Sequence, residues 1–587
     1  MTEVKTTRQI LEERTPPGEG VGLYNKAALK KIREDYDRWM NASVSEADPS
    51  CTGRVTPQTV LGSELPRELI YSPLSSPEFD YSASLAFSGE APFTRGIHAN
   101  MYRGRAFTMR QLSGAGSPEF VNARIKTLLE HGATGLNLAL DVATVQMYDS
   151  DEDEALGQVG TVGVPVDSAG DMEAIFSGIP IDKISASIVT HYPRNTSIVF
   201  PMYLAMAERR GIPWEKLAGS VQNDFIMENL VRGACEYIPP KDAFRIQCDN
   251  IEFIRNEVPR WNAITLNGYN LREYGTSGIT EMAVAVSNGI AIMEEMERRG
   301  HEADFAASRL AFFWSVGNDF FEEVARLRAV RRLWYRIMKY RFGAKDPRSM
   351  WMRCHVQTSG SSLTREEPHV NLVRSAYHAL AAVLGGCQSL HVDSFDEAYA
   401  VPSEESSILA LRTQQVIEAE TQVTQVVDPL GGSYYVEKLT DELEDKILDE
   451  VCEIEKHGGI VEAVSSGWLH RRISSYIERQ QRQVDTGEIK VVGRNHYRAA
   501  KPKLPDIKLH SYDETVGQLM REKLAALRKY RDNIQVARCL EALKTALRKG
   551  QNAMAACVAC ARADVTEGEM RRAFTEALGR WRSPIYT

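Results

Sequence analysis

Short β-forming runs alternate with longer amphipathic helical patterns from about residue 65 to residue 490, and this alternation constrains the fold more than any other feature. The clearest expected strands are residues 135–140, 184–189, 263–266 and 309–313, and the clearest expected helices are residues 120–130 and 277–298. Such alternation predicts an α/β fold in which helices cover a sheet of parallel strands. A closed (β/α)8 (TIM) barrel and an open doubly wound sheet both satisfy the pattern.

The two ends of the chain differ in character from this middle region. Residues 1–64 are polar and punctuated by proline, with one helical pattern near residues 26–40, and they predict an extended arm of the kind that wraps a partner subunit. Residues 500–520 are rich in proline and lysine and predict a linker. Further helical patterns lie at residues 518–531, 534–547 and 567–580. We therefore expect an N-terminal arm (1–64), an α/β region (65–500) and a linker with a C-terminal helical region (501–587).

Composition excludes several classes of function. The net charge of −9 argues against general nucleic-acid binding. No apolar run approaches the roughly 18 residues of a membrane span, and the polar N-terminus lacks the apolar core of a signal peptide. Nine scattered cysteines suit a reducing compartment, so we expect a cytoplasmic protein. Cys557 and Cys560 have redox or metal spacing, but their alanine-rich helical context predicts a structural role, and we expect no metal site.

The most distinctive local motif is the segment HANMYRGRAFTMRQL, residues 98–112. It places Arg103, Arg105 and Arg110, together with Thr108, within eight residues that include no acidic side chain. Each guanidinium presents a fixed fork of donors, so a group this dense suits a phosphate-rich ligand. A solvated basic face would give the same pattern.

This segment resembles the coenzyme-A-binding strand and loop of the adenosylcobalamin-dependent acyl-CoA mutases, the methylmalonyl-CoA mutase family. Eight further blocks match in the family's order: residues 148–151, 160–168, 222–224, 267–273, 309–314, 355–360, 389–391 and 428–435. Single short motifs match by chance, whereas a colinear series from about residue 65 to residue 500 leaves little room for it. The family is built on the (β/α)8 barrel, so the resemblance favours the barrel over the open sheet.

The resemblance implies a radical rearrangement of an acyl-CoA thioester. Adenosylcobalamin supplies the difficult step, while the protein binds and orients the substrate and excludes water. Fused family members carry a C-terminal cobalamin domain with an Asp-x-His-x-x-Gly loop, and this sequence has no such pattern. We therefore expect the large, substrate-binding subunit of a heterodimer or heterotetramer, with a separate small cobalamin-binding subunit.

The same resemblance assigns residues to the CoA moiety. The expected contacts are Met101, Arg105, Thr108, Arg110, Ser220, Asn262 and Arg309, together with His98, which stands where the family has tyrosine. An internal salt bridge is the alternative for Arg309. The strand-end loop from His191 to Asn195 is about two residues longer than its family equivalent and adds Arg194 as a candidate contact to the acyl group. A solvent-facing loop is the alternative there.

Four residues are assigned to the reacting acyl group: Leu112, Arg232, Tyr269 and Asn270. Arg232 aligns with the arginine that binds the free carboxylate of methylmalonyl- or succinyl-CoA, and a buried guanidinium needs such an anion. Leu112 and Asn270 stand where methylmalonyl-CoA mutase has tyrosine and histidine, so ring atoms are lost and the pocket should be larger. Ala139 replaces an aspartate of the 2-hydroxyisobutyryl-CoA enzymes, which weighs against a hydroxyacyl substrate.

The adenosyl and cobalamin side is assigned to Glu273, His355, Gln357, Ser389, Asp393 and Glu397, although the family has asparagine at position 393. The sequence thus predicts a mutase for a bulky substituted malonyl-CoA or succinyl-CoA thioester, such as a benzylmalonyl/phenylsuccinyl pair or an alkylsuccinyl-CoA. Three alternatives remain. They are a methylmalonyl-CoA mutase, a mutase for isobutyryl- or 2-hydroxyisobutyryl-CoA, and a non-catalytic CoA-binding regulatory homologue.

Overall fold

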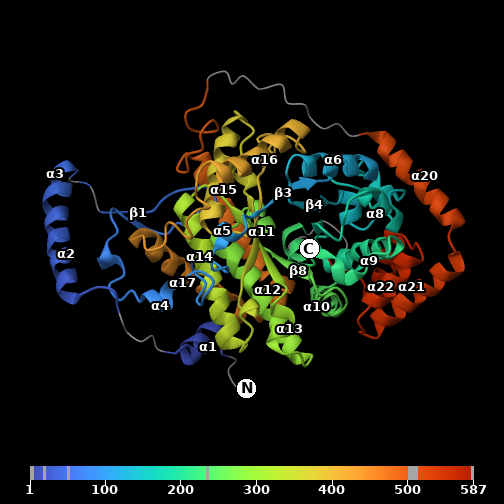
Figure 1. Cartoon of the computed structure of the whole chain (residues 1–587), viewed down its shortest axis with the longest axis horizontal. Coiled ribbons are helices and arrows are strands. Elements are labelled where there is room, and N and C mark those ends of the chain that lie inside the picture. The colour runs from blue at the N-terminus through green and yellow to red at the C-terminus, as the bar shows by residue number, and fades with distance from the viewer. Residues whose placement is uncertain are drawn as a thin grey trace.

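The computed structural model describes residues 5–16, 22–48, 50, 53–232, 237–499 and 513–583, without the side chains of residues 111–113 and 232. Figure 1 shows the course of the chain. A central barrel is surrounded by helices, one N-terminal helix stands apart on one side, and the C-terminal helices cover the opposite side. Among the described helices, none combines the length and the apolar character needed to cross a membrane.

The barrel consists of parallel strands that pair in a continuous ring. The strands are β3 Thr108–Ser113, β4 Gly135–Ala139, β5 Ser185–Val189, β6 Ala218–Val221, β7 Trp261–Asn262, β8 Ile264–Asn267, β9 Leu310–Val316, β10 Arg353–Thr358 and β11 Ser389–His391. Only Ala263 separates β7 from β8, so these two act as one strand. β7 pairs with β6 and β8 with β9, and the backbone N–H of Thr265 donates to the carbonyl of Gln222 at 3.0 Å, which closes the ring. The predicted (β/α)8 barrel is confirmed.

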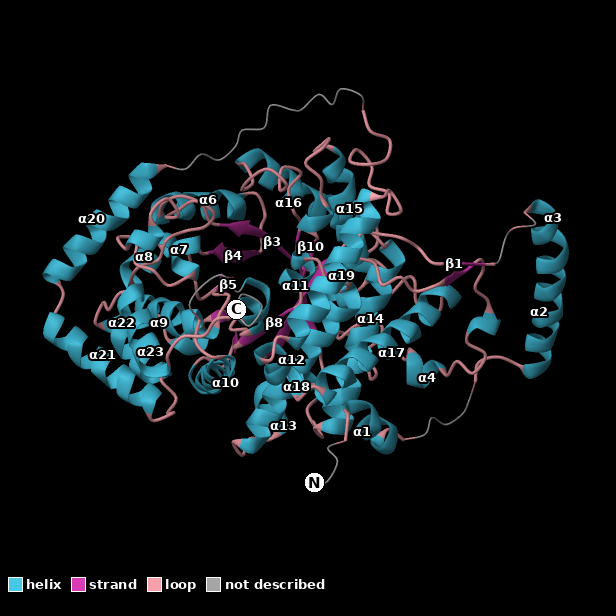
Figure 2. Ribbon diagram, turned by 180° about the vertical axis from the view of Figure 1, so that it is seen from behind, coloured by secondary structure: helices cyan, strands magenta, loops and turns pink. Residues whose placement is uncertain are grey.

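Amphipathic helices connect successive strands and pack outside them (Figure 2). They are α6 Pro118–Glu130, α8 Ala169–Phe176, α9 Pro193–Arg209, α10 Pro240–Glu257, α12 Gly278–Arg298, α14 Phe320–Arg336, α15 Val370–Leu384 and α16 Glu404–Ala419. Shorter helices are α7 Val142–Val145, α11 Tyr269–Tyr274, α13 Ala303–Ala307 and the π-helix η5 Met227–Arg232. The strands and helices expected from the sequence are present as β4, β5, β8, β9, α6 and α12, with ends shifted by at most three residues.

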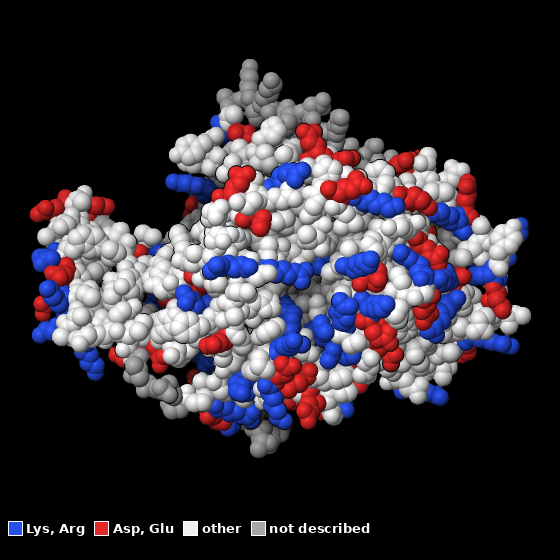
Figure 3. All heavy atoms as spheres, viewed as in Figure 1, with Lys and Arg blue, Asp and Glu red and all other residues white. Residues whose placement is uncertain are grey.

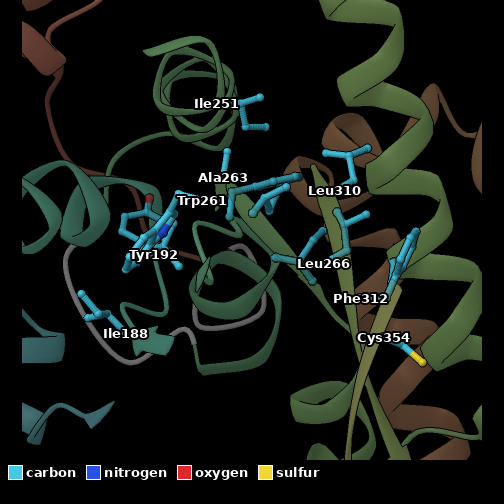
Figure 4. Close-up of a cluster of buried hydrophobic side chains, with 14 of the residues drawn as sticks. Ile188, Tyr192, Ile251, Trp261, Ala263, Leu266, Leu310, Phe312 and Cys354 are labelled. Carbon is cyan, nitrogen blue, oxygen red and sulfur yellow. The ribbon is translucent and has the colours of Figure 1, made fainter. Parts of the chain in front are cut away.

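The hydrophobic core lies between the outer faces of the strands and these helices. Figure 4 shows Leu266, Leu310 and Phe312 side by side on neighbouring strands. Trp261 packs on the rings of Phe200 and Tyr203 in α9, with centroids 4.9 and 5.4 Å apart. Because the apolar side chains point outward to the helices, the inward faces of the strands are free to carry other residues.

Helices α12 and α14 approach closely because α12 has glycine at the contact. A Cβ atom on Gly289 would lie 2.9 Å from the ring of Trp334 and 3.2 Å from Leu266. The N-terminus of α12 is capped by Ser277, whose Oγ accepts the backbone N–H of Thr280. The Ser277 cap thus sets where α12 begins, and Gly289 allows α12 to lie close to α14.

The N-terminal residues form helices α1 Thr7–Arg14, α2 Lys26–Trp39 and α3 Ser45–Ala47, the short strands β1 Arg54–Val55 and β2 Arg67–Glu68, and helices α4 Tyr81–Ser84 and α5 Met101–Gly104. The backbone N–H of Thr7 donates to Glu455 at 2.8 Å, which ties α1 to the body of the protein. No residue of α2 is buried, and α2 stands apart at one end of the molecule (Figure 1). The helix expected near residues 26–40 is confirmed, whereas wrapping of a partner subunit stays a prediction.

The C-terminal part is helical, as expected. Helices α17 Tyr434–Lys456, α18 Gly459–Ser465 and α19 Trp468–Asp485 precede α20 Glu514–Tyr530, α21 Asn533–Arg548, α22 Met554–Arg562 and α23 Glu567–Leu578. The N-terminus of α23 docks on the barrel, because Asp149 accepts the backbone N–H of Gly568 at 2.7 Å and the hydroxyl of Thr566 at 2.8 Å. Cys557 and Cys560 are both buried in α22. The proposed domain boundaries remain predictions.

Candidate functional site

The barrel encloses a polar cavity along its axis. The cavity has a volume of about 210 Å³ and is lined by small polar side chains that include Thr108, Ser187, Ser220, Asn262, Thr265 and Ser389. Bulky branched residues ordinarily fill the interior of such a barrel. Hydroxyl and amide groups here leave a lumen that an extended, hydrogen-bonding ligand can enter.

An arginine cluster lies at the N-terminal end of the strands. Arg353, the first residue of β10, lines the cavity, and its pKa falls to about 10 because of burial and the neighbouring Arg309 and Arg348. Burial, with Arg348 and Arg260, also lowers the pKa of Arg309. Within the described residues, neither Arg309 nor Arg353 forms an ion pair, so this end of the lumen fits an anion such as a phosphate group.

Aromatic rings accompany these cations. The guanidinium of Arg353 lies 5.2 Å from the ring centroid of Trp351, and the ring of His98 meets Trp351 edge-on at 5.1 Å. The structure therefore brings together the predicted residues His98 and Arg309 with Arg348, Trp351 and Arg353, which the motif comparison missed. The sequence did hold a signal for these residues. Arg348 and Trp351 come just before β10 and Arg353 begins it, and β10 carries the matched block at residues 355–360. Figure 3 shows Lys and Arg side chains in a row across the middle of one face, despite the net negative charge.

Arg110, Ser389 and His355 form a chain of hydrogen bonds across the barrel wall. Arg110 donates through Nε to the hydroxyl of Ser389 at 3.0 Å, and that hydroxyl lies 2.9 Å from Nδ1 of His355. A guanidinium only donates, so the Ser389 hydroxyl accepts from Arg110, and either the hydroxyl or Nδ1 of His355 supplies the hydrogen of the second bond. Burial, with Arg110 nearby, lowers the pKa of His355 well below its usual range, so the ring is neutral.

Several buried polar atoms around the lumen have no partner within the described residues. They are Nε2 of His355, Oδ1 of Asn262 and Oε1 of Gln222, and each of these residues lines the cavity. Buried polar groups are nearly always hydrogen-bonded in native proteins. The lumen is thus supplied with donors and acceptors that a bound ligand would satisfy.

Tyr269, Gln357 and Asp393 are linked at the C-terminal end of the strands. Gln357 donates through Nε2 to the hydroxyl of Tyr269 and to Oδ1 of Asp393, both at 2.7 Å. Tyr269 also stacks on Phe313, with ring centroids 4.7 Å apart and an angle of 11° between the planes. The predicted residues Tyr269, Gln357 and Asp393 therefore form one group, and Phe313, on which Tyr269 stacks, lines the cavity.

Two further carboxyl groups, Glu273 and Glu397, converge with Asp393 around Gly360. A Cβ atom on Gly360 would lie 3.1 Å from Oε2 of Glu273 and 3.4 Å from Oδ2 of Asp393, so glycine allows both carboxyl groups to approach the backbone closely. Burial, with neighbouring Asp393, raises the pKa of both glutamates to about 8, and burial raises that of Asp393 to about 7. At neutral pH the cluster holds protons and can both donate and accept.

Comparison with known proteins agrees with this arrangement. Residues 62–580 match the family profile described as Methylmalonyl-CoA mutase. The chain belongs to the methylmalonyl-CoA mutase family. It is 38% identical over 559 residues to methylmalonyl-CoA mutase of Cereibacter sphaeroides, which covers 95% of this chain and 77% of the relative. It is also 38% identical over 505 residues to the 2-hydroxyisobutanoyl-CoA mutase large subunit of Aquincola tertiaricarbonis, covering 86% and 89%. A third relative, methylmalonyl-CoA mutase of Rhizobium meliloti, is 40% identical over 495 residues, covering 84% and 68%.

Membership of the methylmalonyl-CoA mutase family confirms the predicted enzyme class, an isomerase of the mutase type, and the family depends on coenzyme B12. The residues present fit an adenosyl group at the C-terminal end of the lumen. Oδ2 of Asp393, which has no partner within the described part of the chain, and carboxyl groups that hold protons suit the hydroxyl groups of a ribose.

Three residues assigned from the methylmalonyl-CoA mutase family are not seen at the cavity: Arg194 lies in another part of the protein, and the side chains of Leu112 and Arg232 are not described. Arg194 is buried beneath α23, where Nη1 donates to the hydroxyl of Thr575 at 3.1 Å and Nε lies 3.2 Å from the sulfur of Met147. The structure does not place Arg194 on the barrel cavity. The side chains of Leu112 and Arg232 lie outside the described residues; in the backbone, Leu112 is the penultimate residue of β3 and Arg232 is the last residue of η5.

The remaining residues assigned to CoA lie in α5 and in the strands of the barrel. Met101 is buried in α5, and Arg110 is held by the barrel wall through the carbonyl of Leu136 at 2.6 Å. Ser220 donates to the hydroxyl of Ser187 at 3.1 Å inside the lumen. Arg105 is exposed at the end of α5, close enough to lower the pKa of Arg110, for which burial is the larger cause.

Proposed function

We propose that this chain binds the acyl-CoA substrate of an adenosylcobalamin-dependent carbon-skeleton mutase, and that the substrate is a dicarboxylic thioester of the malonyl-CoA/succinyl-CoA type. The observation that carries the proposal is the polar lumen, whose lining includes Arg353 of the arginine cluster and Phe313, on which Tyr269 of the C-terminal group stacks. The arginines would hold the phosphates of CoA, and the hydroxyl-lined barrel would take its pantetheine arm. The acyl group would then reach the C-terminal ends of the strands.

The residues at that end would hold the adenosyl group. Adenosylcobalamin, when bound, supplies the radical that starts the rearrangement. Glu273, Asp393 and Glu397 would bind its ribose, while Tyr269 and Gln357 position the acyl group beside it. The enclosing barrel keeps water from the reacting atoms.

We infer a separate cobalamin-binding subunit as the partner. The relative from Aquincola tertiaricarbonis is named a large subunit and is covered over 89% of its length by this chain. A complex of this chain with a small subunit would place cobalamin over the C-terminal ends of the strands, where the carboxyl cluster lies. Cytoplasmic location stays a prediction.

Methylmalonyl-CoA is the reference substrate, because two of the relatives described above carry its name. Arg232 favours a carboxylated acyl group over the monocarboxylic alternatives. A bulkier substituted thioester is the second candidate. Asn270 favours it, since its side chain is shorter than the histidine of methylmalonyl-CoA mutase and is held against Asn267, with Nδ2 3.1 Å from Oδ1.

The substitution Arg232→Gln tests the substrate class. We expect it to lower kcat/KM for methylmalonyl-CoA and for bulkier dicarboxylic thioesters by at least about 100-fold, since a buried carboxylate loses a charged partner worth about 3–5 kcal/mol. Turnover of a monocarboxylic thioester such as isobutyryl-CoA should not fall. Equal activity of the variant and the wild type on dicarboxylic substrates would contradict the proposal.

A further inference from the structure

Asn267, the last residue of β8, combines deep burial with an unused hydrogen-bond donor. The residue is 1% exposed, and its backbone N–H donates to Oδ2 of Asp224 at 2.8 Å. Its side-chain Oδ1 accepts from the backbone N–H of Asn270 at 3.0 Å and from Nδ2 of Asn270 at 3.1 Å. Nδ2 of Asn267 has no acceptor within the described residues. A buried donor without a partner marks a position where a ligand acceptor is expected.

The orientation of this amide follows from its partner. The backbone N–H of Asn270 can only donate, so the atom of Asn267 that faces it must be the oxygen. The nitrogen therefore occupies the other branch of the side chain. The unused atom is a donor, and a flipped amide would leave two donors facing each other.

The side chain of Asn267 points into the barrel. Thr265 lines the cavity, whereas Leu266 packs outward, within 3.2 Å of the position that a Cβ atom on Gly289 would take. Successive side chains of a strand alternate between its faces, so Asn267 shares the inward face with Thr265, one level nearer the C-terminal end. Its register partner on β9 is Phe313, which lines the cavity and stacks on Tyr269.

We propose that Asn267 is a specificity-determining residue whose Nδ2 donates a hydrogen bond to the thioester carbonyl oxygen of the bound acyl-CoA. The inference rests on the proposed function, because it takes acyl-CoA as the ligand of the lumen. The arginine cluster fixes the nucleotide at the opposite end, and the hydroxyl-lined lumen takes the pantetheine arm. The arm carries the thioester to the level of Asn267, where the carbonyl oxygen is the acceptor.

Asn270 is the competing donor and is less well placed. Its Nδ2 is already engaged with Oδ1 of Asn267, and its side chain is partly exposed, whereas Asn267 is enclosed. In this arrangement Asn270 acts as a positioning residue that fixes the Asn267 amide through its backbone N–H. The two roles predict different effects of substitution.

The test compares two ligands that differ only in the carbonyl oxygen, propionyl-CoA and its thioether S-propyl-CoA. Calorimetric titration of the full chain without cobalamin should show that the wild type prefers propionyl-CoA by about five- to tenfold, the ratio expected for one neutral hydrogen bond. Asn267→Asp keeps the shape and the acceptor toward Asn270 but removes the N–H, so this preference should fall to about one. The matched control Asn270→Ala keeps the backbone N–H that orients Asn267 and should retain the preference.

The outcomes separate the two proposals. Loss of the preference in Asn270→Ala but not in Asn267→Asp would overturn the inference and make Asn270 the donor. Failure of the wild type to bind either propionyl-CoA or methylmalonyl-CoA would overturn the proposed function itself. A measurement on the wild type alone tests the inference even if a variant does not fold. With 13C at the carbonyl of propionyl-CoA, its infrared stretch should move to lower wavenumber on binding, and an unchanged frequency would overturn the inference.

Discussion

Asp393 should govern a pH dependence of stability that the substitution Asp393→Asn removes. The side chain is 2% exposed; Oδ1 accepts from Gln357, and Oδ2 has no partner among the described residues. Burial raises its pKa from an ordinary value of 3.8 to about 7. Asparagine has the same shape, keeps an acceptor for Gln357 and does not titrate.

The magnitude follows from the difference between these two pKa values, which is about 3 units. At 1.36 kcal/mol per unit, ionisation of Asp393 lowers the free energy of unfolding by up to about 4 kcal/mol. Between pH 4 and pH 7 the folded state retains a proton that the unfolded state has released. The stabilisation is therefore complete below about pH 4 and is lost as the pH rises through about 7. We expect Asp393→Asn to be more stable than the wild type at pH 8 and equally stable near pH 4.

Urea unfolding at pH 5 and pH 8, followed by tryptophan fluorescence, measures this difference. Glu444→Gln is the contrasting control. Burial alone would raise the pKa of Glu444, but Arg332 and Arg336 lower it, so glutamine leaves two arginines short of a partner. The free energy of unfolding of Glu444→Gln should be about 3–5 kcal/mol lower than that of the wild type at both pH values. The reasoning would be refuted if Asp393→Asn were no more stable than the wild type at pH 8, or if its gain in free energy of unfolding were the same at pH 5 and pH 8.

Three further predictions follow from the barrel and its helices. Arg353→Ala should weaken CoA binding about 10-fold in calorimetry but leave pantetheine binding unchanged, because the lost charge-assisted bonds go to phosphate; equal loss for both ligands would contradict this role. Ser220→Leu should abolish acyl-CoA binding while the far-UV circular dichroism spectrum is retained, because a branched side chain fills the lumen; unchanged affinity would place the ligand elsewhere. Gly289→Ala should lower the free energy of unfolding by about 1–3 kcal/mol, because its Cβ would lie 2.9 Å from Trp334; urea denaturation with an unchanged midpoint would count against the packing argument.

The barrel could be predicted because each unit repeats a local pattern. Residues 135–140 and 120–130 show strand and helix periodicities that need no distant partner, and β4 and α6 appear there. The polar lumen was not predicted, although β5 alternates Ser185 and Ser187 with apolar residues. Alternation alone did not decide between a barrel and an open sheet, because closure depends on the pairing of the first strand, β3, with the last strand, β11, which lie far apart in the sequence.

Contacts between distant segments explain what the sequence could not show. Residues 191–195 were expected to form a strand-end loop near the acyl group, yet Arg194 lies in the first turn of α9, and its guanidinium donates to Thr575 on α23, 381 residues away. The sequence did not single out Asn267, because an asparagine at the end of a strand is common. Only the geometry shows that its amide nitrogen has no acceptor within the described residues. The pKa of Asp393 likewise depends on burial that no local pattern reveals.

The central claim is that this chain binds an acyl-CoA for a radical rearrangement of its carbon skeleton. The most direct measurement combines the chain with a cobalamin-binding small subunit, adenosylcobalamin and a panel of thioesters: methylmalonyl-, isobutyryl-, 2-hydroxyisobutyryl-, alkylsuccinyl- and benzylmalonyl-CoA. Isomers are resolved by chromatography and mass spectrometry. The account predicts isomerisation of dicarboxylic thioesters that depends on adenosylcobalamin. CoA binding without isomerisation of any thioester in the panel would contradict it and would favour a non-catalytic CoA-binding homologue.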